Sequence, residues 1–361
     1  MPHILYGAPL SLFSGKARAY LDWKGIDYVE VLATPDIHKE IIIPEVGRSV
    51  IPVVKTEDDT ILQDTTKIID HFEEHASGPS VYPNTPRQRL AALLLETYGD
   101  EWLVIPAMHY RWNYNEEWVY GEFGKTAVPE ADAETQYTFG KKAAERFRGF
   151  VPMLGINETT IPAIEQSYEA LLADLEAHFA MHPFLFGTRP SIGDFGLIGP
   201  LYAHLYRDPA SGEIMERLAP RVAEWVRRMV DVAEPQSGEF LPDDAIPDTL
   251  LPILMRMMDE QVPYLERVSD MLAEWLAANP DTELPRAVGM ADFTVEGVIG
   301  QRIAVPFSLW MVQRATDYLR ELNTTDRSAC DALLESISGQ ALPNLFGAPR
   351  LSFEDHLLKA S

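Results

Sequence analysis

Two stretches near the start of this 361-residue chain decide its fold. Residues 3–32 read HILYGAPLSLFSGKARAYLDWKGIDYVEVL, and residues 50–72 read VIPVVKTEDDTILQDTTKIIDHF. The first stretch shows an apolar strand, a helix ended by Gly25 and a second strand, an order typical of parallel strands joined by a crossover helix. The second stretch predicts a strand, an acidic turn, a strand and a helix. The sequence therefore predicts a βαβ-ββα domain over residues 1–80.

Pro52 is unusual because it stands inside an expected strand. Proline has no N–H to donate to a strand ladder, so it belongs at a strand start, an edge or a bend. A cis peptide bond between Ile51 and Pro52 would suit such a position, but the frequency of cis proline favours an ordinary trans proline on an edge strand. The residues alone leave both alternatives open.

Three segments, in their order and spacing, resemble the thioredoxin-like N-terminal domain of glutathione transferases. They are LYGAPLSLFS at residues 5–14 with the helix that follows, VIPVV at residues 50–54, and ILQDTTKII at residues 61–69. The second segment is similar to the family's cis-proline strand. The third is similar to the acidic-hydroxyl pair that holds the γ-glutamyl end of glutathione at a helix start.

This resemblance implies that Ser11 is the catalytic residue, with Tyr6 as the second choice. Ser11 matches the serine of the serine-type classes, and Tyr6 resembles the tyrosine of the tyrosine-type classes. A hydroxyl donor and the positive end of a helix both stabilise a thiolate and so lower the pKa of a thiol from its usual value of about 8.5. The structural alternatives are helix capping by Ser11 and packing of the Tyr6 ring. Ser11 and Ser14 stand in the place of a Cys-x-x-Cys, so thiol-disulfide or dehydroascorbate-type reduction is not expected.

The resemblance also assigns the contacts of the tripeptide. The backbone of Ile51, before Pro52, is expected to pair with the cysteinyl backbone like an added strand. Asp64 is expected to accept from the α-ammonium group, and Thr65 to receive the γ-glutamyl carboxylate at the helix start. Arg48 is expected to pair with the glycine carboxylate. Plain N-capping at the helix start and a solvated Arg48 are the alternatives.

A larger all-helical domain is expected over residues 85–232. Ser191 and Asp194 form a capping box before an unusually apolar helix, which resembles the capped central helix of the family's C-terminal domain. The aromatic-rich segment before it supplies the expected electrophile pocket, namely Tyr110, Trp112 and Tyr114. Ordinary helix packing is the alternative for these rings.

Residues 233–361 exceed the family's usual short tail. Helical spacing of apolar residues predicts helices over 265–276, 306–322 and 326–336, with extended chain over 293–305. Because the apolar faces of these helices must be buried, we expect a mainly helical extension packed on the core.

Composition narrows the possible partners. The chain has 55 acidic and 30 basic residues, a formal charge of −25, which argues against binding to nucleic acid. It shows neither an apolar run of about 20 residues nor a secretory signal, so a cytoplasmic protein without a membrane span is expected. Its single cysteine, Cys330, cannot form an internal disulfide or a thiolate metal cluster.

One metal motif competes with this interpretation. His71-Phe72-Glu73-Glu74-His75 fits the H-x-x-E-H pattern of a zinc peptidase group. The segment ends the last helix of the small domain, where histidine and surface charge are common. We therefore expect no metal and no permanently bound cofactor.

The sequence thus predicts an α+β thioredoxin-like domain followed by a larger all-α domain. The resemblance implies a serine-type glutathione transferase, active in detoxification, that takes glutathione as co-substrate and adds its thiolate to a hydrophobic or aromatic electrophile. It also implies a homodimer. A non-catalytic binding or scaffold protein that keeps the same fold is the alternative.

Overall fold

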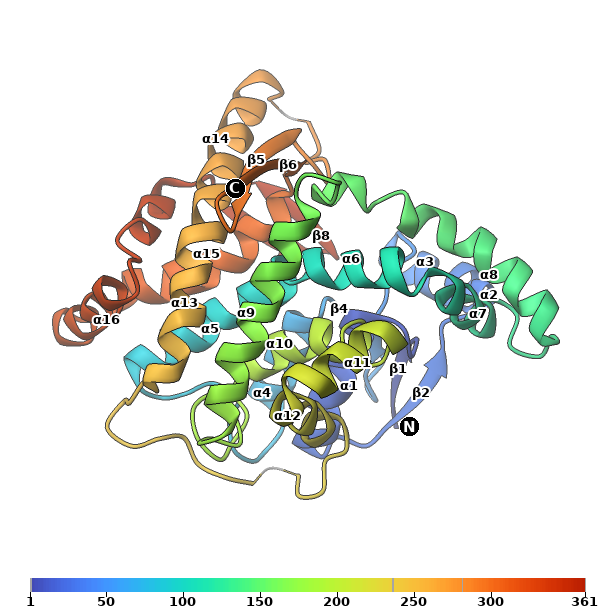
Figure 1. Ribbon diagram of the computed structural model, residues 1–361, viewed down its shortest axis with the longest axis horizontal. Coiled ribbons are helices and arrows are strands. Elements are labelled where there is room, and N and C mark those ends of the chain that lie inside the picture. Colours follow the sequence, from blue (N-terminus) through green and yellow to red (C-terminus); the bar gives the residue numbers. More distant parts are fainter. Residues whose placement is uncertain (1, 236, 281, 361) are drawn as a thin grey trace. The chain divides into compact units, whose positions relative to one another are not determined.

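The computed structural model describes residues 2–235, 237–280 and 282–360. The chain divides into two compact units, and each unit gathers segments that are distant in sequence (Figure 1). Unit 1 contains Met1–Ser80, Ala107–Val151 and Ile198–Ser237. Unit 2 contains Val81–Pro106, Pro152–Leu197 and Gly238–Ser361. The extension therefore shares a unit with earlier helices instead of standing alone.

Unit 1 begins with a four-stranded sheet of order β2-β1-β3-β4. The strands are β1 (His3–Gly7), β2 (Tyr28–Leu32), β3 (Val53–Lys55) and β4 (Ile61–Gln63). β1 is parallel to β2 and antiparallel to β3, and β3 is antiparallel to β4. With α1 (Leu12–Lys24) and α4 (Thr65–His75), this order confirms the predicted βαβ-ββα fold.

Local signals set both ends of α1. The Ser11 Oγ accepts a hydrogen bond from the Ser14 N–H at 3.2 Å, which caps the first turn. Gly25 ends the helix at φ 72°, a left-handed conformation that a residue without a Cβ adopts at low cost. Ser11 is thus held at the positive end of a 13-residue helix.

The segment between β2 and β3 is helical, although its sequence shows no clear helical pattern. It forms α2 (Pro35–Ile37), the π-helical turn η1 (His38–Ile42) and α3 (Ile43–Val46). Ile42 and Val46, four residues apart, are buried in a cluster with Tyr6, Ala33 and Val53. Pro44 interrupts the pattern in the sequence, but proline is tolerated in the first turn of a new helix.

Unit 1 also contains helices from later parts of the chain, and two of them, α7 and α8, are in close backbone contact. They include α7 (Glu116–Ala127), α8 (Ala133–Arg148), α11 (Pro209–Leu218) and α12 (Pro220–Val230), together with most of α6 (Val104–Tyr114) and the end of α10 (Ile192–Ala203). α7 and α8 cross at Gly124 and Gly140. A Cβ at Gly124 would lie 1.9 Å from the Gln136 carbonyl oxygen, and one at Gly140 would lie 1.8 Å from that of Tyr120. Only glycine allows the two helices to approach this closely.

The core of unit 2 forms around α5 (Pro86–Glu101) and α9 (Ile161–Phe179). A Cβ at Gly99 would lie 2.4 Å from the backbone of Gly196, so α5 and the start of α10 are in close backbone contact.

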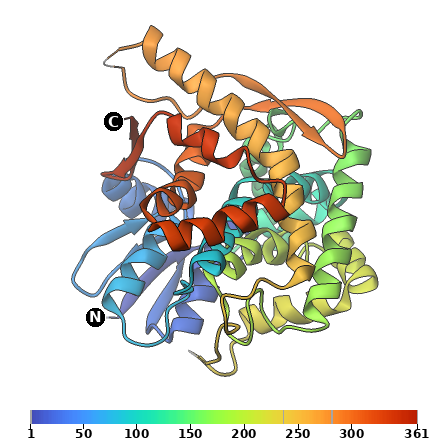
Figure 2. The ribbon, with the colours of Figure 1, turned by 90° about the vertical axis from the view of Figure 1, so that its left-hand side faces the viewer.

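The extension supplies further elements of unit 2. They are η3 (Asp248–Leu250), α13 (Leu251–Arg256), η4 (Met257–Gln261), α14 (Val262–Ala278), β5 (Met290–Val295), β6 (Val298–Ile303), α15 (Pro306–Glu321), α16 (Thr324–Ser336), η5 (Leu342–Gly347), β7 (Leu351–Glu354) and β8 (Leu357–Ala360). α13, α15 and α16 all contact α5, which Figure 2 shows in cyan beside the red and orange extension. The Arg314 guanidinium pairs with the buried carboxylate of Glu96 and donates to the Tyr82 hydroxyl at 2.6 Å. The hairpin β7–β8 was not predicted.

The cap of α5 comes from a residue that is distant in the sequence. The sequence favours a capping box from Thr85 to Gln88, but the Thr85 side chain accepts no backbone hydrogen bond. The carboxylate of Asp244 accepts instead from the N–H groups of Arg87 and Gln88, each at 2.9 Å. The Gln88 side chain donates to the carbonyls of Leu241 and Ala245. A residue of the extension therefore caps this helix.

Candidate functional site

Ser11 lies where its hydroxyl can meet a ligand. Its oxygen accepts from the Ser14 N–H, and its O–H has no acceptor among the residues that the structure describes. The side chain is half-buried at the start of α1. A hydroxyl that already accepts one hydrogen bond still has its own hydrogen to donate. Ser11 therefore combines capping with a free donor at a helix N-terminus.

Tyr6, the second choice, points into the core. Its side chain is buried on β1 and belongs to the apolar cluster with Ile42, Val46 and Val53. Among the two candidates, Ser11 is the one that stays partly open to solvent.

The segment before β3 has unpaired backbone groups. The peptide bond from Ile51 to Pro52 is cis, as the family resemblance implies. Within the described chain the backbone of Ile51 makes no hydrogen bond, since β3 begins only at Val53. Arg48 donates from Nη2 to the Gln63 Oε1 at 2.9 Å, which ties it to the end of β4. The unpaired backbone of Ile51 thus directly precedes β3, and Arg48 is held beside the residue that precedes Asp64.

The start of α4 shows two unusual features. Asp64 has φ 81° and ψ 134°, a backbone conformation rare for a residue with a side chain, while its carboxylate accepts from the N–H groups of Thr66 and Lys67 at 2.9 and 3.3 Å. Thr65 is 1% exposed, and its Oγ1 has no hydrogen-bond partner in the described structure. Strained backbone and orphaned buried hydroxyls are both features that proteins retain at binding sites.

A buried ion pair supports the loop before Ser11, and sequence reasoning missed it. Arg111 is 3% exposed and Asp208 is fully buried. Arg111 Nε lies 2.6 Å from Asp208 Oδ2, and Arg111 Nη2 lies 2.7 Å from Asp208 Oδ1. The guanidinium also donates to the carbonyls of Ala203 at 2.6 Å and Leu10 at 2.8 Å. The signal in the sequence was an arginine inside an apolar helix.

Burial opposes the charges of this pair. It lowers the pKa of Arg111 and raises the pKa of Asp208, while their mutual hydrogen bonds act in the opposite direction. Two short, parallel N–H···O contacts argue that both groups are charged. Burial, followed by the charge of Arg111, holds the pKa of His204 well below its usual value, so this neighbouring imidazole is neutral.

The three aromatic residues expected in an electrophile pocket differ in exposure. Tyr110 and Trp112 are buried, and the ring of Trp112 lies tilted against that of Phe123 with centroids 6.0 Å apart. Tyr114 is 54% exposed and stacks on Tyr110 at a centroid distance of 5.5 Å. Of the three, Tyr114 is the one whose side chain is exposed.

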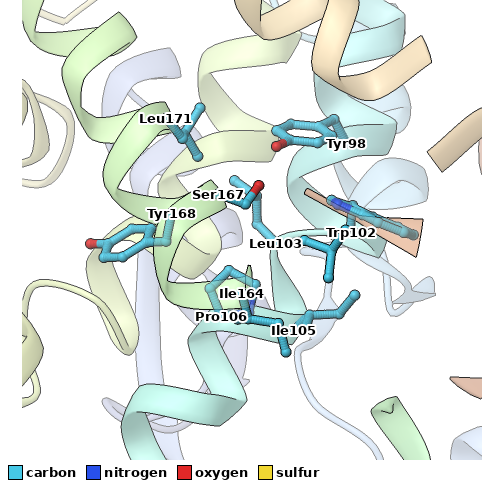
Figure 3. A pocket seen from close by; sticks show the side chains of 10 residues that line it. Tyr98, Trp102, Leu103, Ile105, Pro106, Ile164, Ser167, Tyr168 and Leu171 are labelled. Atoms are coloured by element: carbon cyan, nitrogen blue, oxygen red, sulfur yellow. The ribbon is translucent and has the colours of Figure 1, made fainter. Parts of the chain in front are cut away.

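A small cavity lies in unit 2 and contains none of these residues. It is lined by mainly apolar and aromatic side chains of α5, α6 and α9, of the two residues between α5 and α6, and of Val295 in β5 (Figure 3). The carboxylate of Glu260 contacts two of the lining residues: it accepts from the Trp102 indole N–H at 3.1 Å and from the Ser167 hydroxyl at 3.4 Å. Burial raises the pKa of Glu260. The space, about 10 Å³, holds no more than about one water molecule.

The histidine motif does not form a metal-binding group in the described chain. The rings of His71 and His75 stack at 4.4 Å, and His75 Nδ1 lies 2.7 Å from the His71 carbonyl oxygen. Among the described residues, no group of three or more His, Cys, Asp or Glu side chains is placed to hold a metal ion. Within the same residues, no helix has the length and apolar character to span a membrane.

Comparison with known proteins identifies the family. The model "Glutathione S-transferase, N-terminal domain" matches residues 5–80, and "Glutathione S-transferase, C-terminal domain" matches residues 158–228. These matches follow the chain order and the fold described above. This chain belongs to the glutathione S-transferase family. No curated protein matches its sequence.

Several solved structures are similar to the chain over about two thirds of its length. A glutathione S-transferase from Rhodospirillum rubrum F11 is 17% identical with a TM-score of 0.42, covering 68% of this chain and 96% of its own. The beta-etherase LigF from Sphingobium sp. strain SYK-6 is 19% identical with a TM-score of 0.47, and the match covers 65% of this chain and 97% of LigF. The Tau class glutathione S-transferase MiGSTU from mango is 20% identical with a TM-score of 0.44, and the match covers 69% of this chain and 94% of MiGSTU. The family assignment rests on the two domain models.

Proposed function

We propose that this protein is a serine-type glutathione transferase in which Ser11 activates the thiol of glutathione. The Ser11 O–H, which has no acceptor in the described structure, donates to the sulfur, and the N-terminus of α1 adds favourable potential. Both interactions favour the thiolate and lower the pKa of the thiol. The thiol gives its proton to water, and the thiolate then forms a bond to a carbon of the electrophile while the bond from that carbon to its leaving group, such as a halide, breaks and the leaving group departs with the electron pair. No residue of the protein becomes covalently attached.

One observation carries the proposal: the buried, unpaired hydroxyl of Thr65 follows directly on the strained Asp64. A carboxylate bound at the start of α4 supplies the missing acceptor for Thr65 and meets the positive end of the helix. The γ-glutamyl end of glutathione brings both this carboxylate and an α-ammonium group for Asp64. Because the Thr65 oxygen is enclosed, the side chain has to turn outward to make this contact.

The middle and the far end of the tripeptide fit the remaining groups. The unpaired backbone of Ile51 can form strand-like hydrogen bonds with the cysteinyl residue. Arg48, tied to Gln63 beside the helix start, is the proposed partner of the glycine carboxylate. For the second substrate we propose a hydrophobic or aromatic electrophile that stacks on the exposed ring of Tyr114.

The proposal is tested by binding and turnover measured together. The purified protein should bind glutathione in calorimetry and turn over an activated aryl halide in its presence. Thr65→Val should weaken the affinity for glutathione roughly ten- to a hundredfold, the usual effect of losing a hydrogen bond to a charged group. Thr65→Ser, which keeps the hydroxyl, should retain the affinity.

A truncated ligand sharpens the assignment of Thr65. Cysteinylglycine lacks the γ-glutamyl group, so Thr65→Val should leave its affinity unchanged. Equal losses for both ligands would contradict the assignment. Binding of glutathione without turnover across a panel of electrophiles would favour the non-catalytic alternative. A homodimer, implied by the family, is checked by sedimentation.

A further inference from the structure

The peptide unit between Leu10 and Ser11 is held at both of its polar ends. Its N–H donates to the Ala8 carbonyl at 3.1 Å, and its carbonyl accepts from Arg111 Nη1 at 2.8 Å. A peptide unit is planar, so fixing its two ends fixes the direction in which the chain enters Ser11. Arg111 lies 101 residues further along the chain than Leu10, so no local pattern sets this contact.

Arg111 is itself locked in position. Three more of its five N–H donors reach the two carboxylate oxygens of Asp208 and the Ala203 carbonyl. The guanidinium is rigid and planar, so these contacts fix the direction of the N–H that reaches Leu10. The charged and titratable groups around it are Asp208, Glu122, Arg207 and the neutral His204.

We propose that Arg111, fixed by Asp208, is a positioning residue that sets the Ser11 hydroxyl for its hydrogen bond to the glutathione sulfur. This inference rests on the proposed function of Ser11. Arg111 acts through the backbone and does not touch the substrate. Because α1 keeps its cap and its packing of Leu12 against Gly199, loss of Arg111 shifts the first peptide unit without unfolding the helix.

The test is the double variant Arg111→Met with Asp208→Asn. It removes both charges together, so no uncompensated charge remains buried and the protein should fold. The matched control is Lys24→Met with Glu73→Gln, a second buried ion pair of unit 1, 2.9 Å long, at the opposite end of α1. A merely structural role predicts the same behaviour for both double variants.

The expected results separate positioning from binding. The Arg111/Asp208 variant should bind glutathione with nearly unchanged affinity at low pH, where the thiol is protonated. The pKa of the bound thiol should rise by about one unit, and kcat at pH 7 should fall about tenfold and recover at higher pH. The control variant should keep the parent's thiol pKa and pH–rate profile. Arg111→Lys retains a charge beside Asp208, so its thiol pKa and its kcat at pH 7 should lie between those of the parent and the double variant. It replaces the double variant in the test if the latter does not fold.

Amide hydrogen exchange gives a readout that needs no glutathione. The N–H of Ser11, which donates to the Ala8 carbonyl at 3.1 Å in the parent, should exchange faster in the Arg111/Asp208 variant and not in the control. If the parent protein does not bind glutathione, the proposed function is refuted. The exchange measurement then still tests whether Arg111 positions the backbone at Ser11. Unchanged exchange, or a parent-like thiol pKa in the folded variant, overturns the inference.

Discussion

Replacing Ser11 with alanine separates its two roles. The structure gives the hydroxyl one accepted bond, from the Ser14 N–H, and one free donor. Loss of the accepted bond removes the cap of α1 and costs about 1 kcal/mol of unfolding free energy. Loss of the donated bond to a thiolate costs about 1.5 to 3 kcal/mol of activation free energy, which is roughly a ten- to a hundredfold drop in kcat at neutral pH.

The assay is a pH–rate profile with saturating glutathione, measured beside thermal unfolding. Turnover of Ser11→Ala should recover in part at high pH, where the thiol ionises without help. The control is Asp132→Ala, which removes the cap of another helix of unit 1, a 2.9 Å bond from the Thr135 N–H. It should lose similar stability and no activity. Tyr6→Phe should also remain active, since Tyr6 lies in the core. An active Ser11→Ala together with an inactive Tyr6→Phe would refute the assignment of Ser11.

Three further predictions concern stability and reactivity. Gly124→Ala should destabilise the protein by about 1 to 3 kcal/mol in denaturant unfolding, because its Cβ would clash with Gln136, whereas Gly121→Ala on the same helix meets no atom within 4 Å and should be neutral or stabilising. Burial lowers the pKa of His178 in the folded protein to about 4, below its usual value of about 6.5, so the unfolded chain binds a proton more readily between these two pH values. The free energy of unfolding should therefore fall by about 3 kcal/mol as the pH drops from 6.5 to below 4. In His178→Gln this pH dependence should be weaker, and a variant with the parent's pH dependence would contradict the prediction. Cys330 is buried, and burial raises the pKa of its thiol to about 12. A thiol reagent should therefore label it only as fast as the protein unfolds, and rapid labelling of the folded protein would contradict this prediction.

The sequence alone determined the order of strands and helices in the N-terminal domain and the bounds of several later helices. Alternation of apolar residues, the left-handed Gly25 and the caps at Ser11 and Asp64 act over a few residues, so they can be read locally. The cis bond before Pro52 is different in kind. Residue statistics favoured trans, and the family resemblance indicated the bond that the structure contains.

Only the tertiary structure decided which groups come together from distant parts of the chain. Arg111 meets Asp208 across 97 residues, and Asp244 caps α5 across 156 residues at Gln88. Tyr110 and Tyr114 belong to one helix, yet packing buries the first and leaves the second exposed. Contacts of this kind depend on which faces other elements cover, and no spacing within a single segment records that information.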